Sequence, residues 1–160
     1  MGRLSKMLSG PKVRRNIEKG SELFNAGDLE GARAAFAAAV EIDEEHYEAH
    51  YYLGLALSSL KHHEEAESHL RRSIELKGDE PKSHADLGEL LHNVGRKQEA
   101  EAEYLHALEL DPANSIVIIN LGTLLRDSGR FSEASDLYKR ALALPDLEPE
   151  TRAKLQDLMV

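Results

Sequence analysis

Histidine is the residue of this sequence whose clustering could support chemistry. All eight histidines lie between His46 and His106, and imidazole is the side chain most often used for proton transfer or metal binding near neutral pH. His46 and His50 are four residues apart and would share one face of a helix. Glu48 lies two residues from each, unlike the metalloprotease pattern, in which a glutamate directly follows the first histidine. Because two loosely placed ligands do not make a coordination shell, we expect surface or packing histidines and no metal site.

No other motif of the sequence indicates an enzyme. The sequence has no phosphate-binding glycine-rich loop, no nucleophile elbow and no acidic metal-binding loop. It also has no cysteine, which excludes disulfides, thiolate metal sites and cysteine nucleophiles. We therefore expect a non-catalytic protein with no catalytic residues and no cofactor.

Composition and charge narrow the class of partner. With 160 residues, 41% hydrophobic and 31% charged, the chain should fold as one globular domain or one short repeat array. A formal net charge of −9 argues against a nucleic-acid partner, which would need a basic surface. No apolar run reaches the roughly 18 residues of a membrane span, and no secretory signal is recognisable. These features predict a cytoplasmic protein without stable membrane insertion.

The chain repeats itself with a period of 34 residues and no insertion or deletion. Glycine, alanine and leucine each recur at one position of the repeat, at Gly20, Gly54, Gly88 and Gly122, at Ala32, Ala66, Ala100 and Ala134, and at Leu23, Leu57, Leu91 and Leu125. A repeat of this length indicates an array of small supersecondary units. We place four units, at residues 13–46, 47–80, 81–114 and 115–148.

Each unit is expected to contain two helices. Its apolar residues recur at spacings of three and four, as from Leu53 to Leu57, which is the period of a helix. In three units the break between the helices is expected at a glycine, namely Gly27, Gly95 and Gly129, because glycine can take the left-handed conformation that ends a helix. Lys61 holds this position in the second unit, so the turn there is expected to differ slightly. Pro112 and Pro145 mark the ends of second helices.

On these residues the sequence resembles the tetratricopeptide repeat family, whose 34-residue unit is a helix-turn-helix hairpin. The signature is most complete in the last two units, at Leu87, Gly88, Gly95, Ala100, Tyr104, Ala107 and Pro112, and at Leu121, Gly122, Gly129, Ala134, Tyr138 and Ala141. Lys19 replaces a large apolar residue of the family, which weakens the first unit most. The resemblance implies an all-α fold, a right-handed α-solenoid of helix-turn-helix hairpins.

The two ends differ from the repeats. Residues 149–160 place Leu155, Leu158 and Met159 at helical spacing after Pro149, and we expect a helix that caps the apolar face of the fourth unit. Residues 1–12 are basic and carry no acid. We expect this leader to be flexible or to extend the first helix.

The resemblance also implies where a partner would bind. In the family, the first helices of the units line a concave face, at the second, fifth, sixth, ninth, twelfth and thirteenth positions of each unit. Two apolar patches follow, separated by an acidic stretch, with two asparagines that could bind a ligand backbone. The partner-binding residues selected on this basis are Tyr51, Tyr52, Leu55, Asp86, Glu89, Asn93, Ile116, Ile119, Asn120 and Arg126. In the alternative, Tyr51 and Ile119 are buried between hairpins and only Tyr52 is open.

The function expected from this resemblance is that of an adaptor, which holds a peptide or helix of a partner protein in its concave groove. Asp86 and Glu89 favour a neutral to basic segment. The family members that bind acidic chaperone tails carry Lys, Arg and Asn at positions where this chain has Ile17, Ser21, Tyr52, Lys82 and Asp86, and only Lys82 fits that pattern. Two alternatives stay open: self-association through the ends of the solenoid, and substrate recognition for an enzyme whose catalytic domain is another chain.

Overall fold

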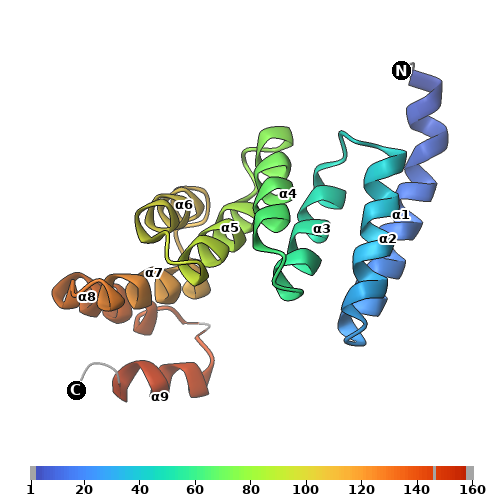
Figure 1. Cartoon of the computed structure of the whole chain (residues 1–160). Coiled ribbons are helices and arrows are strands. Elements are labelled where there is room, and N and C mark those ends of the chain that lie inside the picture. The colour runs from blue at the N-terminus through green and yellow to red at the C-terminus, as the bar shows by residue number, and fades with distance from the viewer. Residues whose placement is uncertain (1–2, 146, 158–160) are drawn as a thin grey trace. The chain divides into compact units, whose positions relative to one another are not determined.

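The structure, a computed structural model, describes residues 3–145 and 147–157. Over these ranges the chain forms helices joined by turns and no strand (Figure 1), so the expected all-α class is confirmed. The helices are α1 (Arg3–Asn25), α2 (Leu29–Ile42), α3 (Tyr47–Ser59), α4 (His63–Leu76), α5 (Pro81–Asn93), α6 (Lys97–Leu110), α7 (Ser115–Asp127), α8 (Phe131–Leu142) and α9 (Pro149–Asp157).

Consecutive helices pack as hairpins, as the repeat predicts. Helix α1 packs on α2, α3 on α4 and α7 on α8, and neighbouring hairpins meet through α2 and α3 and through α6 and α7. By its contacts the chain divides into two compact units, Met1–Asp86 and Leu87–Val160, with the boundary inside α5. We call them the N-terminal unit and the C-terminal unit and describe each by itself.

All four hairpin turns have the same backbone conformation. Gly27, Gly95 and Gly129 have φ values of 82°, 83° and 78°, and the predicted breaks at these glycines are confirmed. Lys61 also takes a positive φ, of 67°, so the second unit keeps the left-handed turn, with a φ slightly smaller than at the three glycines. In that turn the Lys61 N–H donates to the Ser58 carbonyl and the His62 N–H to the Leu57 carbonyl, which is the Schellman pattern that ends a helix. The three glycine turns repeat both hydrogen bonds.

A glycine in the first helix of each hairpin allows the two helices to approach closely. A Cβ atom added at Gly122 would lie 2.5 Å from the Tyr138 ring, and one at Gly88 would lie 2.8 Å from the Tyr104 ring. Phe36 occupies the same place beside Gly20. The large side chain sixteen residues after each glycine therefore fills the seam. In the second hairpin the backbone of the alanine twelve residues after the glycine also comes close, because the Ala66 carbonyl oxygen would lie 3.3 Å from a Cβ atom at Gly54.

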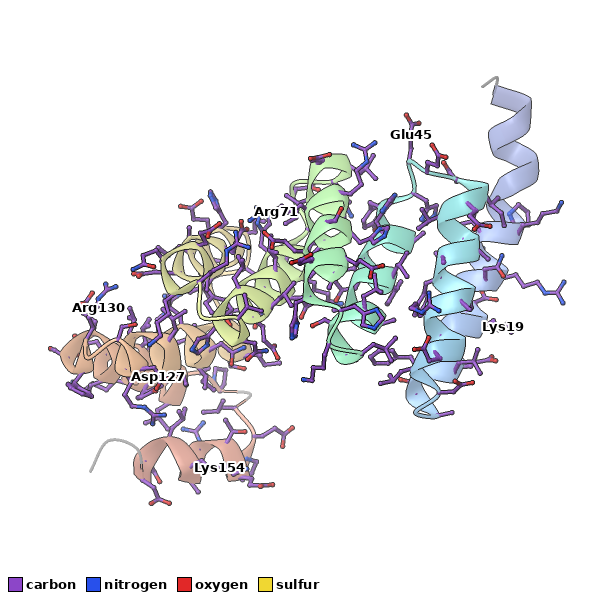
Figure 2. All side chains as sticks on the ribbon, in the orientation of Figure 1. Lys19, Glu45, Arg71, Asp127, Arg130 and Lys154 are labelled. Carbon is purple, nitrogen blue, oxygen red and sulfur yellow. The ribbon has the colours of Figure 1, made fainter. Side chains whose placement is uncertain are left out.

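The ends of the described chain extend the hairpins. Helix α1 begins at Arg3 and so includes residues of the basic leader, and its Val13 is fully buried with Ala39 and Ala49. Lys19, where the family has an apolar residue, is exposed on α1 (Figure 2). At the other end, Leu155 of α9 is buried with 1% of its surface exposed, and α9 packs on α8. The expected contributions of Leu158 and Met159 lie outside the described residues.

The glycine seam gives a stability test. We expect Gly122→Ala to lower the free energy of unfolding by about 1 to 3 kcal/mol, because the new methyl group would overlap the buried Tyr138 ring. Gly10→Ala is the matched control, since Gly10 is exposed on α1 with nothing within 4 Å of the added atom. Because Gly10 precedes Pro11, and proline disfavours the helical conformation of a preceding residue with a Cβ atom, the gain in helix propensity is offset, and stability should change by less than about 1 kcal/mol. A Gly122→Ala variant that is as stable as wild type in urea denaturation would contradict the seam.

The turn at Lys61 gives a second test, with the opposite sign. A left-handed conformation costs a residue with a Cβ atom about 1 to 2 kcal/mol, which glycine avoids at some cost in unfolded-state entropy. We expect Lys61→Gly to stabilise the chain by about 0.5 to 1 kcal/mol. The reverse change, Gly95→Lys, should destabilise it by a similar amount. A melting temperature unchanged in both variants would show that the turn conformation does not limit stability.

Candidate functional site

An open groove of about 320 Å³ lies in the N-terminal unit. Helices α1, α2 and α3 line it, through Ser21, Phe24, Asn25, Phe36, Tyr52 and Leu55. None of these side chains carries a charge. Because its lining is partly apolar and partly polar without charge, the groove suits an uncharged ligand surface with hydrogen-bonding groups.

Aromatic rings form the floor of this groove. Phe36 is buried beside Gly20, where the absence of a Cβ atom leaves room for its ring. The Tyr52 ring stacks on Phe36 with 5.4 Å between ring centroids, and Tyr51 meets Tyr52 edge-on at 5.1 Å. Such pairs hold aromatic side chains in fixed orientations. The floor is therefore ordered before any ligand arrives.

The polar rim of the groove comes from α1. The Ser21 hydroxyl donates a hydrogen bond to the Ile17 carbonyl at 2.9 Å. Its hydrogen is therefore engaged, while its oxygen can still accept a hydrogen bond. Asn25 is exposed near the end of the helix, and within the described part of the chain its side-chain amide makes no hydrogen bond. An amide offers both donors and an acceptor. Asn25 can therefore pair with both groups of a peptide bond.

Tyr51 and Asp86 are joined by a hydrogen bond between α3 and α5. The Tyr51 hydroxyl donates to Oδ2 of Asp86 at 2.7 Å, and both side chains are half-buried. Burial and, after it, the negative charge of Asp86 raise the pKa of Tyr51 above its ordinary value. One oxygen of Asp86 is thus engaged within the chain, although we expected this residue to face the partner.

The structure brings together only part of the selected set. Tyr51 and Tyr52 are in contact, and Tyr52 and Leu55 line one groove. The remaining six residues belong to the C-terminal unit, on α5 and α7, where Ile116 is 68% exposed. Three of them are exposed, namely Glu89, Asn93 and Ile116, and three are half-buried, namely Ile119, Asn120 and Arg126. Their role in binding stays a prediction.

Four groove residues were not selected from the sequence. Ser21, Phe24 and Asn25 occupy the ninth, twelfth and thirteenth positions of the first unit, so the inward-facing pattern could have indicated them. Phe36 lies in a second helix, at the position of Leu70, Tyr104 and Tyr138. Phe36 is as buried as those core side chains, and nothing in the sequence indicates that its ring also lines a groove.

The clustered histidines have structural contacts. His46 caps α3, where its Nδ1 accepts a hydrogen bond from the Ala49 N–H at 3.4 Å. His50 is nearly buried, and its Nδ1 lies 2.9 Å from Nδ1 of His69. His69 lies nineteen residues from His50, and no spacing in the sequence predicts this pair. Among the residues that the structure describes, no group of three or more His, Asp or Glu side chains could hold a metal ion.

Among the helices that the structure describes, none is both long enough and apolar enough to cross a bilayer.

Family models match nearly the whole length of the repeats. Three models, each described as a tetratricopeptide repeat, match residues 17–81, 81–114 and 117–153. No curated protein sequence matches the chain significantly.

Solved structures with a similar fold share little sequence with the chain. A crystal structure of MamA has 23% identity and a TM-score of 0.78, over 95% of this chain and 88% of that one. PilF of Pseudomonas aeruginosa has 22% identity and a TM-score of 0.83, over 94% and 70%. The first tetratricopeptide domain of Spaghetti (RPAP3), bound to the HSP90 peptide SRMEEVD, has 22% identity and a TM-score of 0.72, over 74% and 94%. These similarities establish the fold.

The bond between Tyr51 and Asp86 can be tested by its dependence on pH. Tyr51→Phe should lower the free energy of unfolding by about 1 kcal/mol, because a hydrogen bond to a half-buried carboxylate is lost. Since the pKa of Tyr51 is raised in the folded state, the unfolded chain loses this proton first, at about pH 10. Stability from this group is therefore present below about pH 10 and declines above it. Denaturation from neutral to alkaline pH should show the difference between wild type and variant shrinking, and a constant difference would contradict the assignment.

Proposed function

Because the chain belongs to the tetratricopeptide repeat family, we propose that it is a non-catalytic adaptor, whose groove in the N-terminal unit binds a peptide segment of a partner protein. The observation that carries this proposal is the uncharged groove with a preformed aromatic floor and an unengaged amide on its rim. The fold supports a protein-interaction scaffold in general. What we propose beyond the fold is that the partner binds in this groove, through these residues and by a segment of this class.

The lining of the groove fits a peptide better than a charged small molecule. The Tyr52 ring, which is stacked on the buried Phe36, offers together with Leu55 an apolar surface for one side chain of the ligand. Aromatic residues that are ordered in advance commonly carry much of the energy of a protein interface, about 2 kcal/mol or more each. The Asn25 amide is placed to bind the ligand's backbone, which would fix its register.

The net charge of −9 of the whole chain favours a neutral to basic segment. Helix α1, which supplies the rim of the groove, exposes both acids and bases, among them Glu18, Lys19 and Glu22. The Spaghetti (RPAP3) domain, in contrast, is bound to the peptide SRMEEVD, which contains three acids. Acidic surroundings repel such a ligand and attract a basic one. The peptide-bound structure supports a peptide as the kind of partner. The net charge of this chain supports a peptide that is less acidic than SRMEEVD.

The mechanism that we propose is binding alone, without a cofactor or a catalytic step. Within the C-terminal unit, the family pattern implies a second set of partner contacts, at Glu89, Asn93, Ile116, Ile119, Asn120 and Arg126. The unit boundaries of residues 13–148, the capping role of 149–160 and a cytoplasmic location belong to this proposal.

Peptide selection tests the groove directly. Random peptides displayed on phage would be selected on the full chain, and their affinities measured for wild type and variants by fluorescence anisotropy. We expect Leu55→Arg to weaken the selected peptides by about tenfold or more, because it places a long charged side chain in the groove. Asn25→Ala should weaken them several-fold, through the loss of about 1 kcal/mol of hydrogen bonding.

Lys139→Ala is the control, because Lys139 is exposed on α8 of the C-terminal unit. It should bind the peptides as wild type does, and circular dichroism should show the same helical content in all variants. Peptides that bind Leu55→Arg as tightly as wild type would place the site elsewhere. A selection that enriches acidic peptides would contradict the proposed charge preference.

A further inference from the structure

Two imidazoles connect the second hairpin to the loop that precedes it. His50 on α3 and His69 on α4 lie with their Nδ1 atoms 2.9 Å apart and their ring centroids 5.1 Å apart. On the other side of its ring, Nε2 of His50 lies 3.1 Å from the carbonyl oxygen of Glu44. Glu44 belongs to the loop between α2 and α3. The three groups thus form a continuous chain of hydrogen bonds, which we call the histidine relay.

The partners of the relay determine where its protons lie. The Glu44 carbonyl can only accept, so Nε2 of His50 must carry a hydrogen. In the neutral ring, Nδ1 of His50 is then bare and accepts, so Nδ1 of His69 must carry the hydrogen of the short contact. Nε2 of a neutral His69 is left with a lone pair. The Nδ1–H form is the less common tautomer of neutral histidine. The contact with Nδ1 of His50 assigns it to His69.

We propose that the histidine relay is a proton-controlled clamp, which holds the loop between the first two hairpins, tolerates one added proton and opens on the second. The first proton can bind Nε2 of His69, where it leaves both hydrogen bonds intact. A second proton must bind Nδ1 of His50, which would place two N–H donors face to face at a distance of 2.9 Å. That arrangement cannot hydrogen-bond, so the rings must separate.

Both rings stand in surroundings that resist protonation. His50 is only 7% exposed, and burial is the main cause that lowers the pKa of each of the two histidines. Charged and titratable groups from two elements face the relay: Glu44 and His46 from the loop, and Glu65 and Arg72 from α4. The two histidines also line a pocket of about 510 Å³, to which α4 contributes Glu75. Helix α2 contributes the apolar Val40 to that pocket.

The sign of the pH effect follows from these lowered pKa values. The unfolded chain takes up protons on these histidines at about pH 6.5, before the folded chain does. The stability contributed by the neutral relay is therefore fully present above about pH 6.5 and is lost as the pH falls below it.

Comparison of the repeats shows that the relay is a local feature. His84 stands one repeat after His50, and its Nε2 lies 3.3 Å from the carbonyl of Gly78, which is one repeat after Glu44. The contact between a histidine Nε2 and a carbonyl of the preceding loop therefore occurs in two repeats. The position of His69, however, is held by Ala35, Glu103 and Leu137 in the other units. The pairing of two imidazoles belongs to the second hairpin only.

Imidazole nitrogen spectroscopy on the full chain tests the tautomers and the order of protonation. With ¹⁵N-labelled protein we expect the Nε2–H form of His50 and the Nδ1–H form of His69 at about pH 8. On acidification His69 should take up its proton first, at Nε2. Protection of the Ala49 and His50 amides against hydrogen exchange should then fall about tenfold, only when His50 becomes charged. A His50 that titrates first, or a His69 in the Nε2–H form at about pH 8, would overturn the proposal.

Three variants separate the clamp from ordinary acid loosening. In His69→Asn the side-chain amide stands in place of Nδ1 and can donate to Nδ1 of His50 or, turned over, accept from it, so the acid-induced loss of protection should disappear. In His69→Leu no donor remains, and protection should be low at every pH. His106→Asn, which removes an exposed histidine, should behave as wild type. The same acid-induced loss in His69→Asn as in wild type would overturn the proposal, and so would stoichiometric Zn²⁺ binding that shifts both Nδ1 resonances.

Discussion

The close approach of the two helices within each hairpin is the constraint on which the rest of the structure depends. A glycine in the first helix leaves space that a large side chain of the second helix fills, as Tyr138 does beside Gly122. In the first hairpin this side chain is Phe36, beside Gly20. The contact buries Phe36 yet leaves one face of its ring stacked on Tyr52 of the next hairpin. The same packing that closes a hairpin therefore builds the floor of the groove.

Polar contacts then fix how successive helices meet. In the C-terminal unit, Lys97 donates to the carbonyl of Asp127 at 2.6 Å, and Arg152 of α9 donates to the carbonyl of Leu142 at 2.5 Å. Basic groups at the carbonyl ends of helices are favoured by the unpaired acceptors and by the helix dipole. Exposed contacts of this kind contribute little stability each. Hydrophobic contact has no direction, so the apolar seam alone does not specify which helix ends lie together. These directional hydrogen bonds do.

Two sites of different chemistry share helices α2 and α3 of the N-terminal unit. The groove has an uncharged lining that includes Phe36 and Tyr52, and its properties should change little near neutral pH. The pocket beside His50 and His69 is lined by titratable and charged groups. Phe36 and Val40 lie one helical turn apart on α2, and each lines one of the two pockets. The two sites are thus neighbours on one short helix.

The sequence by itself determined the all-α class, the 34-residue unit and the turns at Gly27, Gly95 and Gly129, because these features depend on residue type and spacing along the chain. It could not show that Lys61 takes the glycine conformation, since only the packed hairpin imposes that strain. The tertiary structure alone decided that Tyr51 is engaged by Asp86 and that His50 meets His69. It also decided that Ser21, Asn25 and Phe36 share a groove with Tyr52. These contacts join residues far apart in sequence, and their partners are chosen by how helices pack in space, which a periodic pattern does not specify.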